Sequence, residues 1–108
     1  MDIVLKTKAL EMQAFLKALE PTLEAEATLR QALVLLELST GGEANNAALA
    51  RSLGLSKPVV CRVIQGFTKK GLVETRDHEE DRRCTLHRLT EEGILVLEAA
   101  LGSSVGPD

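Results

Sequence analysis

The stretch over residues 46–58 constrains the fold more than any other part of this sequence. Its first part, NNAALARSLGLS, predicts a short helix over about residues 46–53, because Gly54 can adopt the left-handed conformation that ends a helix. Ser56 then marks a new helix start: its hydroxyl can cap, and Pro58 suits a first turn where the missing N–H does no harm. Two such helices joined by LGLS have the dimensions of a helix-turn-helix.

The second helix should continue to about Lys70, with Gly71 at its end, and a hairpin follows. The segments LVETR (72–76) and RCTLHRL (83–89) predict two strands around a charged tip, DHEEDR. A hairpin in this place is a wing. The expected fold class is therefore mainly α with a small β-hairpin wing: a winged helix-turn-helix with flanking N- and C-terminal helices.

Helical patterns flank this unit on both sides. Apolar residues recur at three- and four-residue steps over residues 2–20, and the near-continuous apolar run over about 28–38 predicts a buried helix. Thr90, followed by two glutamates, predicts the start of a last helix that ends at about Leu101. The tail, residues 102–108, is expected to fray.

The net charge of −3 argues against a nucleic-acid partner until the charge is located along the chain. Residues 56–88 carry eight basic and five acidic side chains, a local net charge of +3. Residues 1–55 carry −2 and residues 89–108 carry −4. Basic charge is thus concentrated in the third of the chain that holds the predicted second helix and wing.

A helical wheel divides the helix after Ser56 into two faces. The apolar face should dock on the core and consists of Val60, Val63, Ile64 and Phe67. The other face suits the major groove, because Arg62 can bond guanine and Gln65 can bond adenine. The residues expected to contact DNA here are Ser56, Lys57, Pro58, Arg62, Gln65 and Lys69, with Ser56 and Lys57 on phosphates. The alternative is an ordinary amphipathic helix with a solvated polar face.

The tip of the predicted wing adds Arg82 and Arg83 beside Asp81. An arginine at a hairpin tip can enter the minor groove, where narrow stretches concentrate negative potential. We expect Arg83 to do so, with Asp81 as the partner that orients it and the other acidic residues facing solvent. The alternative is a solvated charged loop.

The chain resembles the MarR family of bacterial winged-helix regulators. The resemblance rests on LARSLGLSKPVVCRVIQGFTKKGLVE followed by DRRCTLHRLTEEG, and it covers roughly residues 28–101. The wing pattern is its more specific part: the aspartate and arginine fall on Asp81 and Arg83, and LT-x-x-G falls on residues 89–93. The resemblance implies a homodimer on a palindromic operator, with the recognition helix in the major groove and the wing arginine in the minor groove.

The chain departs from this family in its length. Family members usually carry a longer C-terminal helical region that interlocks with the first helix to form the dimer. Residues 1–108 are expected to form one domain, in which the flanking helices, 1–20 and 90–101, are left for dimerisation. The run ILVLEAAL is apolar almost all round, so exposing it to water would be costly. The alternative is a last helix packed on its own core.

Other kinds of site find little support in the sequence. No nucleophile and base, acid pair or phosphate-binding loop stands at a recognisable spacing, so an enzyme is not expected. Without C-x-x-C or H-x-x-x-H spacing, neither a metal site nor a cofactor is expected. Cys61 lies beside the predicted DNA face, where oxidation could weaken binding, but packing at the helix edge is the favoured interpretation. Cys84 should pack under the wing on the face of Leu86.

The chain shows no apolar run of membrane-spanning length and no leader pattern, which favours a cytoplasmic protein without a membrane partner. With Phe15 and Phe67 as the only aromatic side chains, an aromatic-lined effector pocket is not indicated, and a small-molecule effector stays an open question.

The sequence therefore predicts a dimeric regulator that binds specific double-stranded DNA sequences, with repression as the expected role. A second function class stays open, a winged-helix module that binds proteins or antagonises a related regulator by forming heterodimers. The overall acidity and the short C-terminal region favour this alternative.

Overall fold

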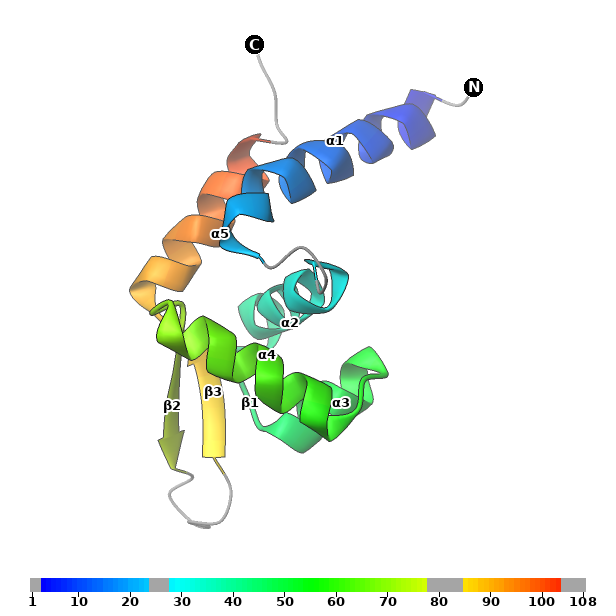
Figure 1. The fold of residues 1–108 in the computed structure, drawn as a ribbon. Coiled ribbons are helices and arrows are strands. Elements are labelled where there is room, and N and C mark those ends of the chain that lie inside the picture. Colours follow the sequence, from blue (N-terminus) through cyan, green and yellow to red (C-terminus); the bar gives the residue numbers. More distant parts are fainter. Residues whose placement is uncertain (1–2, 24–27, 78–84, 104–108) are drawn as a thin grey trace.

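The computed structural model describes residues 3–23, 28–77 and 85–103. These residues form five α-helices, one short 3-10 turn and three strands (Figure 1). In chain order they are α1 (Ile3–Leu19), η1 (Glu20–Thr22), α2 (Thr28–Gly41), β1 (Glu43–Ala44), α3 (Asn46–Leu53), α4 (Lys57–Lys69), β2 (Val73–Asp77), β3 (Thr85–Leu89) and α5 (Glu91–Ser103). This order confirms the mainly α winged helix-turn-helix with flanking helices.

The hydrophobic core has α4 at its centre. The four apolar residues expected to dock are all buried, with exposed fractions of 0–5%: Val60, Val63, Ile64 and Phe67. They pack in one cluster with side chains of α2, α3, the start of β2 and the residue just before it: Val34, Leu35, Leu38, Leu49, Leu72 and Val73. Burial of such a side chain stabilises the fold by roughly 1.5–3 kcal/mol, so the core fixes which face of α4 points outward.

The helix-turn-helix has the ends that its sequence predicts. Asn45 caps α3, since its Oδ1 accepts a hydrogen bond from the N–H of Ala48 at 2.7 Å. Gly54 follows α3 with a φ of +69°, in the left-handed region. Ser56 caps α4, since its hydroxyl oxygen accepts from the N–H of Val59 at 3.3 Å. Local signals are thus enough to set the turn between the two helices.

The sheet has three strands, where the sequence predicted a two-stranded hairpin. All pairs are antiparallel and the strand order is β1-β3-β2. β1 contains only Glu43 and Ala44, which pair with Arg88 and His87 of β3. A strand of two residues shows no alternation that sequence reasoning can detect. Its pairing attaches the wing to the segment that follows α2.

Two helices extend further than expected. α2 continues past Leu38 to Gly41, and the hydroxyls of Ser39 and Thr40 donate to carbonyls within the helix. α5 continues past Leu101 to Ser103, so the first two residues of the expected frayed tail are helical. The next proline is Pro107, too far along to interrupt the helix at Leu101. Residues 104–108 lie outside the described part of the chain.

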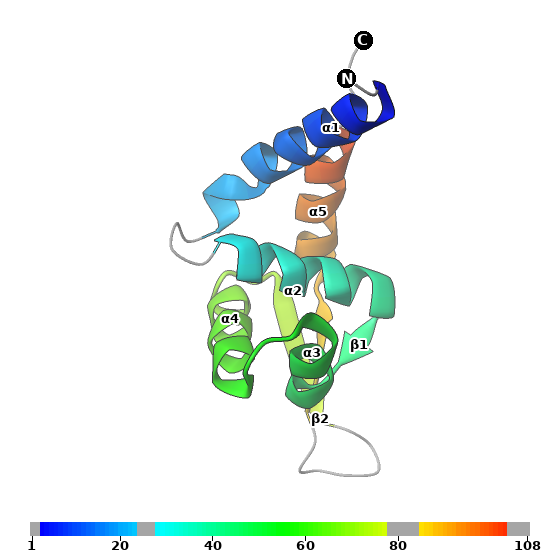
Figure 2. The same ribbon diagram turned by 90° about the vertical axis from the view of Figure 1, so that its right-hand side faces the viewer.

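The helices α1 and α5 lie side by side at the end of the molecule opposite the wing strands (Figures 1 and 2). α2 lies between this pair and the helix-turn-helix (Figure 2). Phe15 and Leu19 of α1 and Leu97 and Ala100 of α5 join the core. Along the described ranges, none of the helices has both the length and the apolar character needed to span a membrane.

Candidate nucleic-acid interface

The outward face of α4 presents the side chains that the sequence singled out. Ser56, Lys57, Pro58, Arg62, Gln65 and Lys69 are all exposed. Pro58, Arg62, Gln65 and Lys69 lie opposite the buried face that holds α4 on the core, so their exposure follows from packing. Ser56 and Lys57 stand at the N-terminal end of the helix. We call these six exposed residues the α4 face.

The charge around the α4 face is more one-sided than the net charge of residues 56–88 indicates. From residue 44 to residue 73 the chain contains no aspartate or glutamate and five basic residues: Arg51, Lys57, Arg62, Lys69 and Lys70. Within the described ranges, Lys57, Arg62 and Lys69 have no ion-pair partner. The net charge of residues 56–88 does not reveal this excess of basic residues, because that range also includes the acidic residues of the wing tip. The three cations are available to an external anion.

Two other basic residues of that window are engaged within the protein. The Arg76 guanidinium donates to both carboxylate oxygens of Glu43, at 2.6 and 2.8 Å. The guanidinium of Arg88 donates to Glu74 at 2.6 Å. These pairs lie on the exposed side of the sheet and tie its three strands together. Because these two arginines are neutralised by glutamates, the positive potential of this region comes mainly from the α4 face.

The three residues expected at the wing tip, Asp81, Arg82 and Arg83, lie outside the described residues, as does Cys84. The strands on either side of the tip are described up to the pair formed by Asp77 and Thr85. The minor-groove contact of Arg83 and the orienting role of Asp81 remain predictions.

Sequence reasoning missed one buried polar residue in the wing, His87. It is only 5% exposed, its Nδ1 lies 2.9 Å from the Thr75 hydroxyl, and its Nε2 lies 2.8 Å from Oδ1 of Asn46. Burial lowers the pKa of the imidazole. Leu86, expected on the inner face of this strand, is only half-buried. Since His87 has a partner for each nitrogen, it can occupy the inward position without an unsatisfied group.

Cys61 lies at the edge of α4, as the favoured interpretation expected. It is half-buried, and its sulfur accepts a weak hydrogen bond from the Gln65 amide at 3.7 Å. Among the described residues, no group of three histidine, cysteine or acidic side chains is placed to hold a metal ion.

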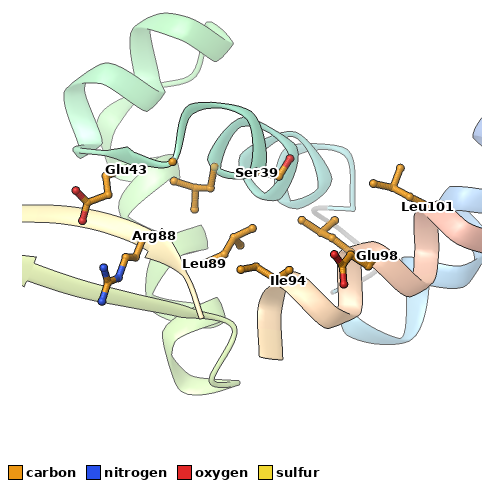
Figure 3. Close-up of a pocket in the computed structure, with 10 residues that line it drawn as sticks. Ser39, Glu43, Arg88, Leu89, Ile94, Glu98 and Leu101 are labelled. Carbon is orange, nitrogen blue, oxygen red and sulfur yellow. The ribbon is translucent and has the colours of Figure 1, made fainter. Parts of the chain in front are cut away.

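A mostly apolar cavity of about 570 Å³ lies between α2, the sheet and α5 (Figure 3). Leu38, Leu89 and Ile94 contribute to its lining, and Glu43 and Arg88 stand at one end. Its size is within the range that accommodates small organic ligands. A second cavity of about 470 Å³ lies between α4 and the wing strands, and its lining includes Gln65, Lys69, Thr75 and His87.

Apolar side chains remain exposed along the outer surfaces of α1 and α5. Those with exposed fractions of 44–76% are Ile3, Val4, Leu5, Leu10 and Met12 of α1 and Ile94, Leu95 and Leu101 of α5. Helices that leave many apolar side chains exposed are typical of a protein–protein interface. We call it the α1–α5 surface.

Comparison with known proteins places this geometry in a family. The model of the MarR family matches residues 27–83, more than half of the chain. The transcriptional repressor MprA of Escherichia coli is 34% identical over 74 residues, which cover 68% of this chain and 42% of MprA. The chain thus spans less than half the length of that relative.

Solved structures with the same fold match most of the chain. The transcriptional regulator Tm0710 from Thermotoga maritima superposes with a TM-score of 0.83 at 19% identity, covering 95% of this chain and 70% of that one. A mutant of MarR from E. coli complexed with operator DNA gives a TM-score of 0.69 at 20% identity, covering 91% of this chain and 68% of MarR. At these identities the structures support the fold.

Proposed function

The chain belongs to the MarR family, and on that premise we propose that it is a transcriptional regulator that binds specific sequences of double-stranded DNA. The observation that carries the proposal is the α4 face, where three cations without an ion-pair partner among the described residues stand on a segment of thirty residues that has no carboxylate. Phosphates dominate the affinity of proteins for DNA, so a surface of this kind favours a DNA partner despite the net charge of −3.

In this proposal α4 lies in the major groove. Arg62 contacts guanine and Gln65 contacts adenine, while Ser56, Lys57 and the N-terminal N–H groups of α4 hold phosphates. The wing then reaches the adjacent minor groove, where Arg83 is inserted.

We further propose repression of transcription by a homodimer on a palindromic operator. The α1–α5 surface is the proposed dimer contact, because two copies that join there would cover exposed apolar side chains. The two recognition helices should then lie about 34 Å apart, one turn of DNA. Similarity to a protein named as a transcriptional repressor supports the sign of regulation. A cytoplasmic location is proposed with it.

Binding to random duplex DNA across a salt series tests the proposal. We expect affinity to fall steeply as salt rises, and Arg62→Ala to weaken binding and to lower the slope by about one. Arg30→Ala, an equal charge change at an exposed position of α2, is the matched control and should leave the slope unchanged. Absence of binding at low salt would refute DNA regulation and favour the protein-interaction module.

Sedimentation of the intact chain tests the dimer. Leu95 is 60% exposed on α5, so Leu95→Glu should disrupt the dimer at little cost to the core. Leu29→Glu, at a position of α2 that is 67% exposed, is the matched control and should leave the dimer intact. A wild-type chain that stays monomeric at high concentration would contradict the proposed assembly.

A further inference from the structure

The cavity between α4 and the wing strands contains side chains that can bind an oxyanion. They are Gln65 and Lys69 of α4 and Thr75 and Thr85 of the strands, with His87 behind them. None of the residues that line it is acidic. Lys69 is the only lining residue with a formal charge, and no carboxylate of the described residues pairs with it. The cavity therefore combines one unpaired cation with threonine hydroxyl groups in a hollow whose remaining lining is largely apolar.

The cavity also lies where a DNA strand would pass. If α4 enters the major groove and the wing enters the neighbouring minor groove, the sugar-phosphate backbone between the two grooves must cross the space between α4 and the wing. Gln65 and Lys69 lie on the α4 face and line the cavity as well. The site thus adjoins the proposed DNA surface.

Behind Thr75 stands a buried partner, His87. The Oδ1 atom of Asn46 can only accept a hydrogen bond, so the His87 Nε2 that lies 2.8 Å from it carries a hydrogen. In the neutral imidazole Nδ1 must then accept, which engages the hydroxyl proton of Thr75. In the protonated imidazole Nδ1 donates to the Thr75 oxygen instead. The Thr75 proton is then free for a ligand in the cavity.

On these grounds we propose that the cavity binds one phosphate oxyanion of the DNA backbone, with Lys69 and Thr75 as its contacts and His87 as the positioning residue behind Thr75. The assignment rests on the proposed DNA-binding function and adds Thr75 and His87 to the residues that serve it. The same chemistry would suit a free phosphate.

The proposed arrangement links anion binding to proton uptake. The described groups around His87 are Asn46 of α3, Thr75 of β2, and Cys61 and Lys69 across the cavity on α4, and none is a carboxylate. In the free protein burial lowers the pKa of His87, and no neighbouring carboxylate opposes that shift. An anion in the cavity favours the imidazolium, so by linkage DNA should bind more tightly as the pH falls.

DNA affinity measured by fluorescence anisotropy at about pH 8 and about pH 6 tests this site. Wild type should bind more tightly at the lower pH. Thr75→Val should lose about tenfold at that pH, the effect of one hydrogen bond to a charged group. His87→Gln should abolish the pH dependence. Lys69→Gln should lower the salt slope by about one.

Two matched controls accompany these variants. Thr68→Val removes a hydroxyl from the same lining, but that hydroxyl already donates to the Ile64 carbonyl at 2.8 Å, so affinity should not change. His78→Gln removes the only other histidine and should leave the pH dependence in place.

The possible outcomes test the phosphate site in the cavity and the proposed DNA-binding function separately. If wild type binds DNA and Arg62→Ala weakens it, but Thr75→Val and His87→Gln behave as wild type, the cavity site is refuted and DNA binding stands. If wild type binds no DNA at low salt, both are refuted. Inorganic phosphate added to the DNA-free protein, with the His87 pKa followed by NMR, identifies the source. A saturable rise in the His87 pKa would support a site that also binds free phosphate. If the pKa does not rise while Thr75→Val and His87→Gln still change DNA binding, the site binds only the phosphodiester of DNA.

Discussion

Gly93→Ala should destabilise the protein because α5 passes unusually close to Leu72, in the short segment between α4 and β2. A Cβ atom at this position would lie 2.2 Å from the Leu72 carbonyl oxygen and 3.1 Å from its carbon. That oxygen accepts a hydrogen bond from the N–H of Thr90 at 3.0 Å, and Leu72 is itself buried. The backbone cannot move away without breaking this bond, so the clash cannot be relieved as it could at a flexible side chain.

The expected cost combines three effects. Overpacking typically costs about 1–3 kcal/mol, and a strained or broken buried hydrogen bond costs about 1–3 kcal/mol more. Alanine regains about 1 kcal/mol through its higher helix propensity. The free energy of unfolding should therefore fall by about 1–5 kcal/mol, a large part of the stability of a domain this size.

Urea denaturation followed by circular dichroism measures this effect, at a fixed protein concentration because dimerisation would itself stabilise the fold. Gly66→Ala is the matched control: Gly66 lies inside α4, where an added Cβ atom would meet nothing within 4 Å, and alanine should stabilise there by about 0.5–1 kcal/mol. A Gly93→Ala protein as stable as wild type would show that the α5 junction tolerates displacement, contrary to the packing argument.

Three further experiments test other contacts. Asn45→Ala removes the cap of α3 and should lower the free energy of unfolding by about 1 kcal/mol in the same assay; no change would mean that the cap contributes nothing. A double-mutant cycle on Glu43 and Arg76 should give a coupling below about 1 kcal/mol, since their side chains are 30% and 41% exposed; a larger value would contradict solvent screening. Burial lowers the pKa of His87 in the folded state, so the unfolded chain binds more protons below the ordinary value of 6.5. Stability from this group is complete above that pH and is lost as the pH falls, a decline that His87→Gln should reduce and that chemical denaturation across pH would measure.

The sequence was sufficient to predict the elements whose signals are local. The caps of α3 and α4 and the left-handed Gly54 depend on residues within one helical turn, and the buried face of α4 follows from its own periodicity. The exposure of Arg62 and Gln65 follows from the same pattern. The α4 face could therefore be assembled without a structure.

Contacts between distant segments could not be predicted in this way. His87 can be buried because Asn46, 41 residues earlier, forms a hydrogen bond with one of its ring nitrogens. The alternation of residues along a strand cannot predict a partner so distant in sequence. Arg76 pairs with Glu43 across 33 residues, which a local charge count treats as free positive charge. β1 was missed because its two residues acquire their strand conformation from pairing with β3.

The junction at Thr90 joins the wing to α5 by a single residue that is fixed on three sides. Its N–H donates to the Leu72 carbonyl, its hydroxyl donates to the Gly71 carbonyl at 2.6 Å, and the same hydroxyl oxygen accepts from the N–H of Gly93 at 3.0 Å. These three hydrogen bonds restrain the backbone at Thr90, so we expect β3 and α5 to move together as one rigid unit. In a dimer held together through α5, a tilt between the two subunits would be carried directly into the distance between their wings.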